Sequence, residues 1–204
     1  MGTLLDVTFL TSAFVTLFVI MDPVGTVPIF LSLTGGYKPE RVRRAARQAV
    51  LVSFVVISTF AFFGQSILDY LHVSLPALQC AGGLLLLLVA LELLTGKDDE
   101  PTASGDANVA LVPLGTPLLA GPGAIVATMV FSKRVHDVAD FSALALAVIA
   151  VHLCLWLAMT FSIPILRLIR ESGILLVTRI AGLLLSAIAV QLVADAVREF
   201  IVAG

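Results

Sequence analysis

Charged residues are scarce in this sequence. Of its 204 residues only 13% are Asp, Glu, Lys or Arg, while 59% are hydrophobic, against roughly 25% charged in soluble proteins. No polar stretch is long enough to build a soluble domain with its own core. A net charge of -2 gives no reason to expect nucleic acid as a partner. These features predict a single transmembrane domain over residues 1–204, surrounded by the lipid bilayer.

Cysteines and familiar catalytic motifs are also few. Cys80 and Cys154 lie in separate apolar runs, and we interpret both as small buried hydrophobic residues. The chain has no His-Glu-x-x-His metal site, no Gly-x-Ser-x-Gly nucleophile, no Cys-x-x-Cys pair and no paired catalytic aspartates. We therefore expect no enzyme activity, no metal and no bound cofactor.

The hydrophobic residues form six runs, each long enough to cross a bilayer as a helix. The first run lacks the basic segment and cleavage site of a signal peptide, so we expect it to remain as a span. Residues 96–108 are rich in charge, Pro, Ser and Gly, which predicts a polar linker. The expected fold is all-α with six transmembrane helices. The runs cover residues 7–33, 48–71, 75–95, 109–131, 141–166 and 175–201.

Lysine and arginine are unevenly distributed over the expected loops. With six spans, nine of the 12 Lys and Arg residues lie on one side, five of them between residues 38 and 47. Positively charged loops are retained in the cytoplasm. We therefore expect both termini on the outer face of the plasma membrane. Residues 41–47 also suit the amphipathic start of the second span.

The first run is interrupted in its middle by Met-Asp-Pro-Val-Gly-Thr-Val-Pro at residues 21–28. A carboxylate at this depth is costly unless it faces a polar interior, and Pro23 and Pro28 break the helical hydrogen-bond ladder. Asp22 would suit the N-cap of a new helix starting near Pro23. The interruption predicts a broken helix in which Asp22 serves as a cap, a solute ligand or both.

A similar interruption recurs 99 residues later, where Pro122 matches Pro23. At the same spacing Gly83-Leu-Leu-Leu matches Gly182-Leu-Leu-Leu, and Glu92 matches Gln191. We interpret residues 6–95 and 109–201 as two three-helix repeats joined by the linker. A unit with an odd number of spans must be followed by an inverted copy, as in many transporters. Helices one and four would then both be broken, and the glycines would allow close helix contact.

The second interruption, Gly121-Pro122-Gly123, is uncharged. Exposed amides at such a helix start favour an anionic group, for example an amino acid carboxylate. If this helix start lies opposite Asp22, the two together predict a site suited to a zwitterion. The alternative is a pair of kinked helices that serve packing alone. Threonine hydroxyls either orient the solute or bond to their own backbone. The expected solute-binding residues are Asp22, Pro23, Gly25, Thr26, Pro28, Thr116, Gly121, Pro122 and Gly123.

Three other intramembrane polar residues are candidates for ion coupling or gating. Glu92 either has this role or extends to the nearby interface. His152 either relays protons or is bonded to a backbone carbonyl, and Gln191 either has a coupling role or bonds to a neighbouring helix. Asp195 and Arg198, one helical turn apart, suit an interfacial ion pair.

Two sequence motifs, one in each half, indicate that the whole chain resembles a known family. Asp-Pro-x-Gly-x-x-Pro-x-Phe at residues 22–30 and Pro-Leu-Gly-Thr-Pro-Leu-Leu-Ala-Gly-Pro-Gly-Ala-Ile at residues 113–125 resemble the MarC family of bacterial inner-membrane proteins. The resemblance implies six spans in the bacterial inner membrane and a relation to neutral amino acid transporters.

We therefore expect a secondary transporter of small solutes, above all neutral amino acids, with alternating access around the first and fourth spans. The alternative is a membrane scaffold or accessory protein that transports nothing. Either H⁺ or Na⁺ could be the coupling ion. The chain could also form a homo-oligomer.

Overall fold

The structure is a computed structural model that describes residues 6–34, 37–95 and 119–203. Regular structure in these ranges is helical. Thr116, the expected linker and the start of the expected fourth span lie outside the described residues. The helices are α1 (Val7–Met21), α2 (Thr26–Leu33), α3 (Pro39–Leu71), α4 (Leu75–Thr95), α5 (Pro122–Lys133), α6 (Val138–Thr160) and α7 (Ser162–Ala203).

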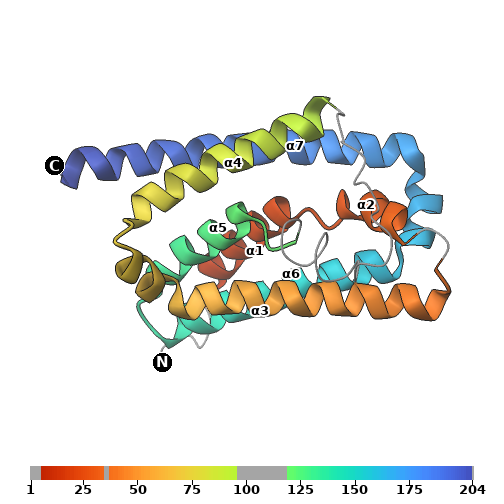
Figure 1. Ribbon diagram of the computed structural model, residues 1–204, viewed down its shortest axis with the longest axis horizontal. Helices are drawn as coiled ribbons and strands as arrows, with labels where there is room; N and C mark the ends of the chain where they lie inside the picture. The colour runs from red at the N-terminus through yellow and green to blue at the C-terminus, as the bar shows by residue number, and fades with distance from the viewer. Residues whose placement is uncertain (1–5, 35–36, 96–118, 204) are drawn as a thin grey trace.

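The helices form three layers (Figure 1). The antiparallel helices α4 and α7 make one outer layer, and α3 and α6, also antiparallel, make the other. The shorter helices α1, α2 and α5 lie between them. Helix α5 contacts both α3 and α4, whereas α2 contacts α6 and α7. The interrupted part of the chain is therefore enclosed by the long helices.

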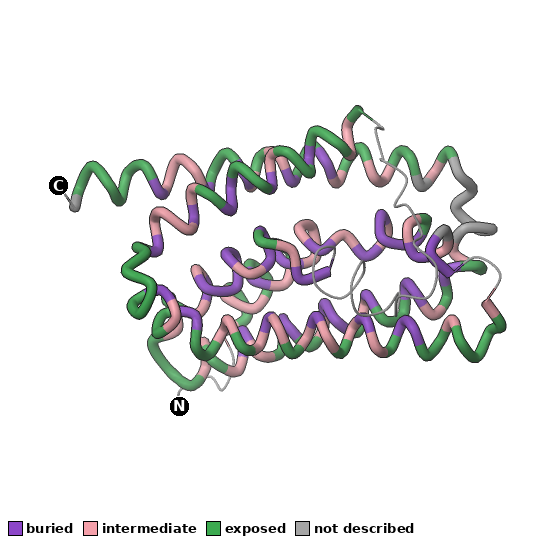
Figure 2. The backbone as a smooth tube through the Cα atoms, in the orientation of Figure 1, coloured by how far each residue is buried: buried purple, intermediate pink, exposed green. Residues whose placement is uncertain are grey.

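The burial pattern is that of a membrane protein. Buried residues are concentrated in the middle layer and on the inner faces of α3 and α6 (Figure 2). Outward-facing apolar side chains are highly exposed, for example Leu51 at 60% and Leu88 at 58%. Helices α3, α4 and α6 and the 175–202 part of α7 are each long and apolar enough to cross a bilayer. Lipid, rather than water, suits such surfaces.

The predicted runs locate the helices but not always their ends. The run 75–95 coincides with α4, whereas α3 begins at Pro39 rather than at residue 48 and so contains the basic residues 41–47. Helix α6 ends at Thr160, and α7 begins at Ser162, so the loop expected between the last two spans is helical. Hydropathy marks the part of a helix that lies in hydrocarbon, but backbone hydrogen bonds continue the helix beyond it.

The predicted break in the first run is confirmed. Helix α1 has 15 residues, and α2 has only 8. At 1.5 Å per residue α2 is about 12 Å long, too short to cross a membrane alone. Across the described residues four helices meet the length and hydropathy of a full span, and α1, α2 and α5 are shorter.

Glycines bring α4 and α7 into close contact, as predicted. A Cβ placed on Gly83 would lie 2.9 Å from the carbonyl oxygen of Ala189, and one placed on Gly182 would lie 3.2 Å from that of Ala90. Larger side chains would push the two helices apart. Small residues serve the same purpose at many helix contacts in membranes.

Candidate functional site

Asp22 ends α1 and shapes the turn that follows. Its backbone is left-handed, with φ 38°, and its N–H donates to the carbonyl of Phe18. Its half-buried carboxylate accepts a hydrogen bond from the Gly25 N–H at 3.0 Å. Aspartate tolerates this conformation because its short polar side chain bonds to nearby backbone.

The expected N-cap role of Asp22 at Pro23 is wrong. Residues 23–25 form a turn, and α2 begins only at Thr26, with Gly25 as its N-cap. The carboxylate closes this turn instead of capping a helix at Pro23, because the left-handed backbone of Asp22 directs the chain into the turn. A Cβ on Gly25 would overlap the Oδ2 atom of Asp22. Glycine at this position therefore leaves room for the carboxylate where it bonds to the backbone.

The neighbours of this turn differ in exposure. Pro23 and Gly25 are buried, whereas Pro28 is exposed on α2. Thr26 is also buried, and its hydroxyl donates to the Asp22 carbonyl at 2.8 Å. Of the two predicted uses of the threonine hydroxyl, Thr26 shows the backbone bond.

The start of α5, at the second predicted break, has a different construction. Gly121 is the N-cap of α5, with extended backbone at φ -63° and ψ 165°, and Pro122 occupies the first turn. No side chain caps this helix start. Gly123 is buried, and a Cβ placed on it would overlap the Leu86 side chain of α4. The first turn of α5 is thus held against a neighbouring helix rather than by a side chain of its own.

The residues beside both breaks share one hydrophobic core. Met21 and Phe30 flank the Asp22 turn, and Leu119 and Ala124 flank the Gly121 break. All four belong to the same cluster of buried residues, and α1 packs against α5. The segments that flank the expected site residues of the two halves therefore pack into one core, and Thr116 lies outside the described residues.

His152 lies between α3 and α6. Its Nδ1 is 2.8 Å from the Val148 carbonyl oxygen, and its Nε2 is 3.2 Å from the Ser53 hydroxyl. A carbonyl only accepts, so Nδ1 carries the proton, and Nε2 accepts from Ser53 in the neutral ring. The Phe54 ring packs edge-on against the imidazole, with centroids 5.2 Å apart. The predicted bond to a backbone carbonyl is confirmed.

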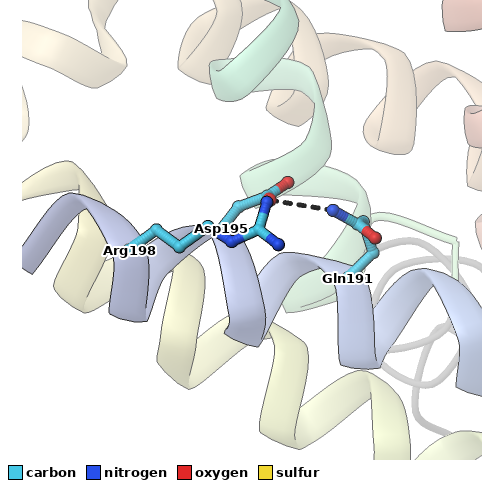
Figure 3. Close-up of polar contacts among 3 residues, drawn as sticks. All are labelled: Gln191, Asp195 and Arg198. Atoms are coloured by element: carbon cyan, nitrogen blue, oxygen red, sulfur yellow. Dashed lines mark hydrogen bonds and ion pairs between the residues drawn. The ribbon is translucent and has the colours of Figure 1, made fainter.

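The predicted bond from Gln191 to a neighbouring helix is wrong. Its amide donates to the Asp195 carboxylate at 2.8 Å, one turn along the same helix, α7 (Figure 3). Gln191 is exposed, and the acceptor that its amide reaches lies on its own helix. The predicted ion pair of Asp195 and Arg198 is confirmed at 4.0 Å. Glu92 is also exposed, on α4, in keeping with a side chain that extends to the interface.

The cysteines are less buried than expected. Cys80 and Cys154 are free thiols, and both are half-buried rather than enclosed. They lie on α4 and α6, whose outer faces carry exposed apolar residues. Partial exposure in such a position puts a small apolar residue against lipid instead of core.

A charged cavity that sequence reasoning missed lies where α4 begins and α5 and α7 end. Its volume is about 460 Å³, and it carries groups of both signs. The only sequence signal was the cluster of charged residues at the ends of two apolar runs. The lining residues are Leu75, Gln79, Val130, Lys133, Arg134, His136, Asp195, Arg198 and Glu199.

Comparison with known proteins decides the family. The sequence matches the MarC family integral membrane protein model over residues 7–201. The chain belongs to the MarC family. It is 35% identical to the UPF0056 membrane protein MJ1677 of Methanocaldococcus jannaschii, over 95% of this chain and 98% of that protein. YvbG of Bacillus subtilis is 30% identical over 91% and 92%. YhcE of Escherichia coli is 29% identical over 91% and 90%.

No solved structure matches this MarC-family chain. Family membership agrees with the apolar outer surface of the long helices, and the predicted membrane location is confirmed. The names of the relatives describe membrane proteins and specify no solute. Function must therefore be argued from the two breaks and their surroundings.

Proposed function

We propose that this MarC-family protein is a secondary transporter of small solutes, with neutral amino acids as the favoured class. In this proposal residues 6–95 and 109–201 are two inverted three-helix repeats of a six-span protein. The solute binds between the broken first and fourth spans. No enzymatic step is involved.

The helix bounds support the repeat. Helix α3 begins at Pro39 and α6 at Val138, which are 99 residues apart. The same spacing maps α2 onto residues within α5, and maps α4 onto residues within the α7 segment. Helices α3 and α6 run in opposite directions, as do α4 and α7 (Figure 1). This is the relation expected between the two copies of an inverted repeat.

Contacts between matching residues give independent support. Ser53 bonds to His152, which is 99 residues away. Two equivalent residues can meet only close to the axis that relates them. The contacts of Gly83 with Ala189 and of Gly182 with Ala90 are reciprocal at the same spacing. A single twofold axis that passes between α3 and α6, and also between α4 and α7, accounts for both observations.

The two breaks in the middle layer carry the functional proposal. One presents the carboxylate of Asp22, and the other presents the start of α5 without a capping side chain. A carboxylate attracts an ammonium group, and a helix start attracts a carboxylate. A zwitterionic solute satisfies both. The cavity with charges of both signs, at the other end of α5, would admit the same class of solute.

Topology and coupling complete the proposal. The start of α1 and the end of α7 point to one end of the molecule, and the basic start of α3 lies at the other (Figure 1). We place the basic end in the cytoplasm and both termini outside the bacterial inner membrane. Of the three candidates for coupling to H⁺ or Na⁺, Glu92, His152 and Gln191, we favour His152, because it alone of the three is buried.

Counterflow in liposomes tests this function. Purified protein is offered labelled glycine, alanine, serine and threonine, with and without a pH or sodium gradient. We expect counterflow of at least one of them, and Asp22→Asn should lower it by about ten- to hundred-fold, because asparagine keeps the turn but loses the charge.

Asp6→Asn is the matched control. Asp6 also accepts a hydrogen bond from a backbone N–H three residues on, at 2.9 Å from Phe9, but it lies at the start of α1, away from the break. Its replacement should leave counterflow within about two-fold of the native rate. Absence of counterflow for all four amino acids would reject the amino acid proposal. Equal rates for Asp22→Asn and the native protein would reject the site.

A further inference from the structure

A basic pocket and an apolar groove meet on the surface between α3 and α6. The pocket, about 340 Å³, lies at the start of α3 and the end of α6. The groove, about 380 Å³, continues from it along the same two helices. Arg47 and Trp156 line both. We propose that the two together bind one anionic phospholipid, with its phosphate in the pocket and an acyl chain in the groove.

The pocket has the charge for a phosphate. Arg43, Arg44 and Arg47 line it, and Glu40 is the acidic residue beside them. The three arginines are exposed, and none forms an ion pair with a described residue. Arginine is well suited to bidentate phosphate binding. The local excess of positive charge therefore complements an anionic headgroup.

Thr160 adds an independent observation. Its hydroxyl oxygen is buried and has no hydrogen-bond partner within the described part of the chain, and Thr160 lines the basic pocket. A buried polar group without a partner costs free energy. Thr160 thus brings an unsatisfied hydroxyl to the lining of the arginine-rich pocket, and a phosphate oxygen would supply the acceptor that it lacks.

The groove has the apolar lining to hold the part of an acyl chain nearest the headgroup. On α3 it extends from Arg47 to Phe54, which is about 10 Å along the helix axis. Ile149 and Leu153 of α6 form the facing wall, and both are about half exposed. Trp156 lies at the junction of pocket and groove, a place where tryptophan is favoured at membrane interfaces.

A phospholipid explains both parts with one molecule. A free phosphate would leave the apolar groove uncovered, and an apolar partner helix would leave the arginines unpaired. Anionic lipids do bind in basic pockets between transmembrane helices. The inner end of the groove reaches His152, so a bound acyl chain would cover the Ser53–His152 contact from the lipid side.

Native mass spectrometry of the full-length protein in detergent tests the site. Phosphatidylglycerol and phosphatidylcholine with identical oleoyl chains are titrated separately. We expect tighter binding of phosphatidylglycerol. The variant Arg43→Gln/Arg44→Gln/Arg47→Gln should lose this preference, with affinity lowered on the order of 100-fold, because each basic residue contributes roughly a factor of five.

The matched control removes three positive charges at the opposite end of the molecule. Lys133→Gln/Arg134→Gln/Arg198→Gln alters the charged cavity and should leave phosphatidylglycerol binding within about two-fold. Leu153→Trp fills the groove without touching the arginines, and it should also weaken binding. Leu88→Trp, on the exposed face of α4, should not.

Four results would overturn the proposal. These are equal binding of the two lipids by the native protein, equal losses in the two charge variants, and displacement of phosphatidylglycerol by inorganic phosphate at equal concentration. The fourth is a protein dimer that excludes lipid until Leu153→Trp disrupts it, which would identify a second copy of the chain as the occupant of the groove.

Discussion

The first and second halves of the chain match in their packing residues and differ in their polar ones. Between α4 and α7 one buried cluster is built from matching residues of both halves. Its members include the pairs Leu86 and Leu185, and Ala90 and Ala189. The polar pairs at the same spacing are unlike: Asp22 and Gly121, Ser53 and His152, Glu92 and Gln191. In the proposed repeat the two halves therefore share packing residues, while each half has its own polar groups.

The two breaks show this difference most clearly. The Asp22 turn is closed by its own carboxylate, and Gly25 leaves room for that group. The start of α5 has no capping side chain, and Gly123 leaves room for Leu86 of α4. The first break is thus a local structure that holds a charge in place. The second depends on the packing of another helix.

Exchanging each glycine for alanine should give the largest effects and separate the two constructions. Gly25→Ala and Gly123→Ala should each lower the free energy of unfolding by about 1–3 kcal/mol, because the added Cβ overlaps Asp22 or Leu86. Denaturant titrations in detergent measure the loss of unfolding free energy, and thermal unfolding in the same detergent gives the accompanying shift in Tm.

Second-site changes identify the partner in each case. Asp22→Ala should relieve Gly25→Ala but not Gly123→Ala, and Leu86→Ala should do the reverse. Two results would contradict the contrast between the two sites. One is that Asp22→Ala or Leu86→Ala rescues both glycine variants, and the other is that it rescues neither.

A swap between α3 and α6 should give an intermediate effect. Ser53→Ala leaves Nε2 of His152 without its hydroxyl donor and should cost about 1–2 kcal/mol of unfolding free energy. If an axis relates the two positions, Ser53→His combined with His152→Ser rebuilds the same bond from the other side. The swapped protein should unfold within about 1 kcal/mol of the native one. Positions that are not equivalent would make the swap worse than either single change.

The sequence predicts part of this structure well. The Asp-Pro segment locates the break in the first span, and the Gly-Pro segment locates the start of α5, because proline and a buried carboxylate do not fit a continuous helix in lipid. The apolar run 75–95 gives α4. Glycine matches also locate the closest contact of the long helices, since few other residues permit it.

Other features depend on local geometry that a pattern does not contain. The left-handed backbone of Asp22 follows from its turn, so the expected N-cap was placed at the wrong helix end. Gln191 found its acceptor on its own helix, and only three-dimensional distances decide between such partners. The charged cavity joins the ends of helices that are far apart in sequence. The basic start of α3 and residues 167–172 of α7 are helical although they carry charged residues.

Removing the side chain of Gln191, the residue that matches Glu92, should have the smallest effect on stability and counterflow. Gln191→Ala removes one exposed hydrogen bond to Asp195 within α7, which should cost no more than about 0.5 kcal/mol and leave counterflow within about two-fold. Ser186→Ala, which removes another exposed side-chain hydrogen bond within α7, is the matched control. A loss of counterflow in Gln191→Ala alone would restore Gln191 as a coupling residue.

The inverted arrangement of the two halves is tested most directly by cysteine labelling. Lys38 and Asp137 are exposed residues 99 apart that stand directly before α3 and α6. Each is changed to cysteine in a chain carrying Cys80→Ala and Cys154→Ala, and a membrane-impermeant maleimide is added to intact and to permeabilised cells. We predict that Asp137→Cys reacts in intact cells and that Lys38→Cys reacts only after permeabilisation. Reaction of both positions from the same side would contradict the inverted repeat.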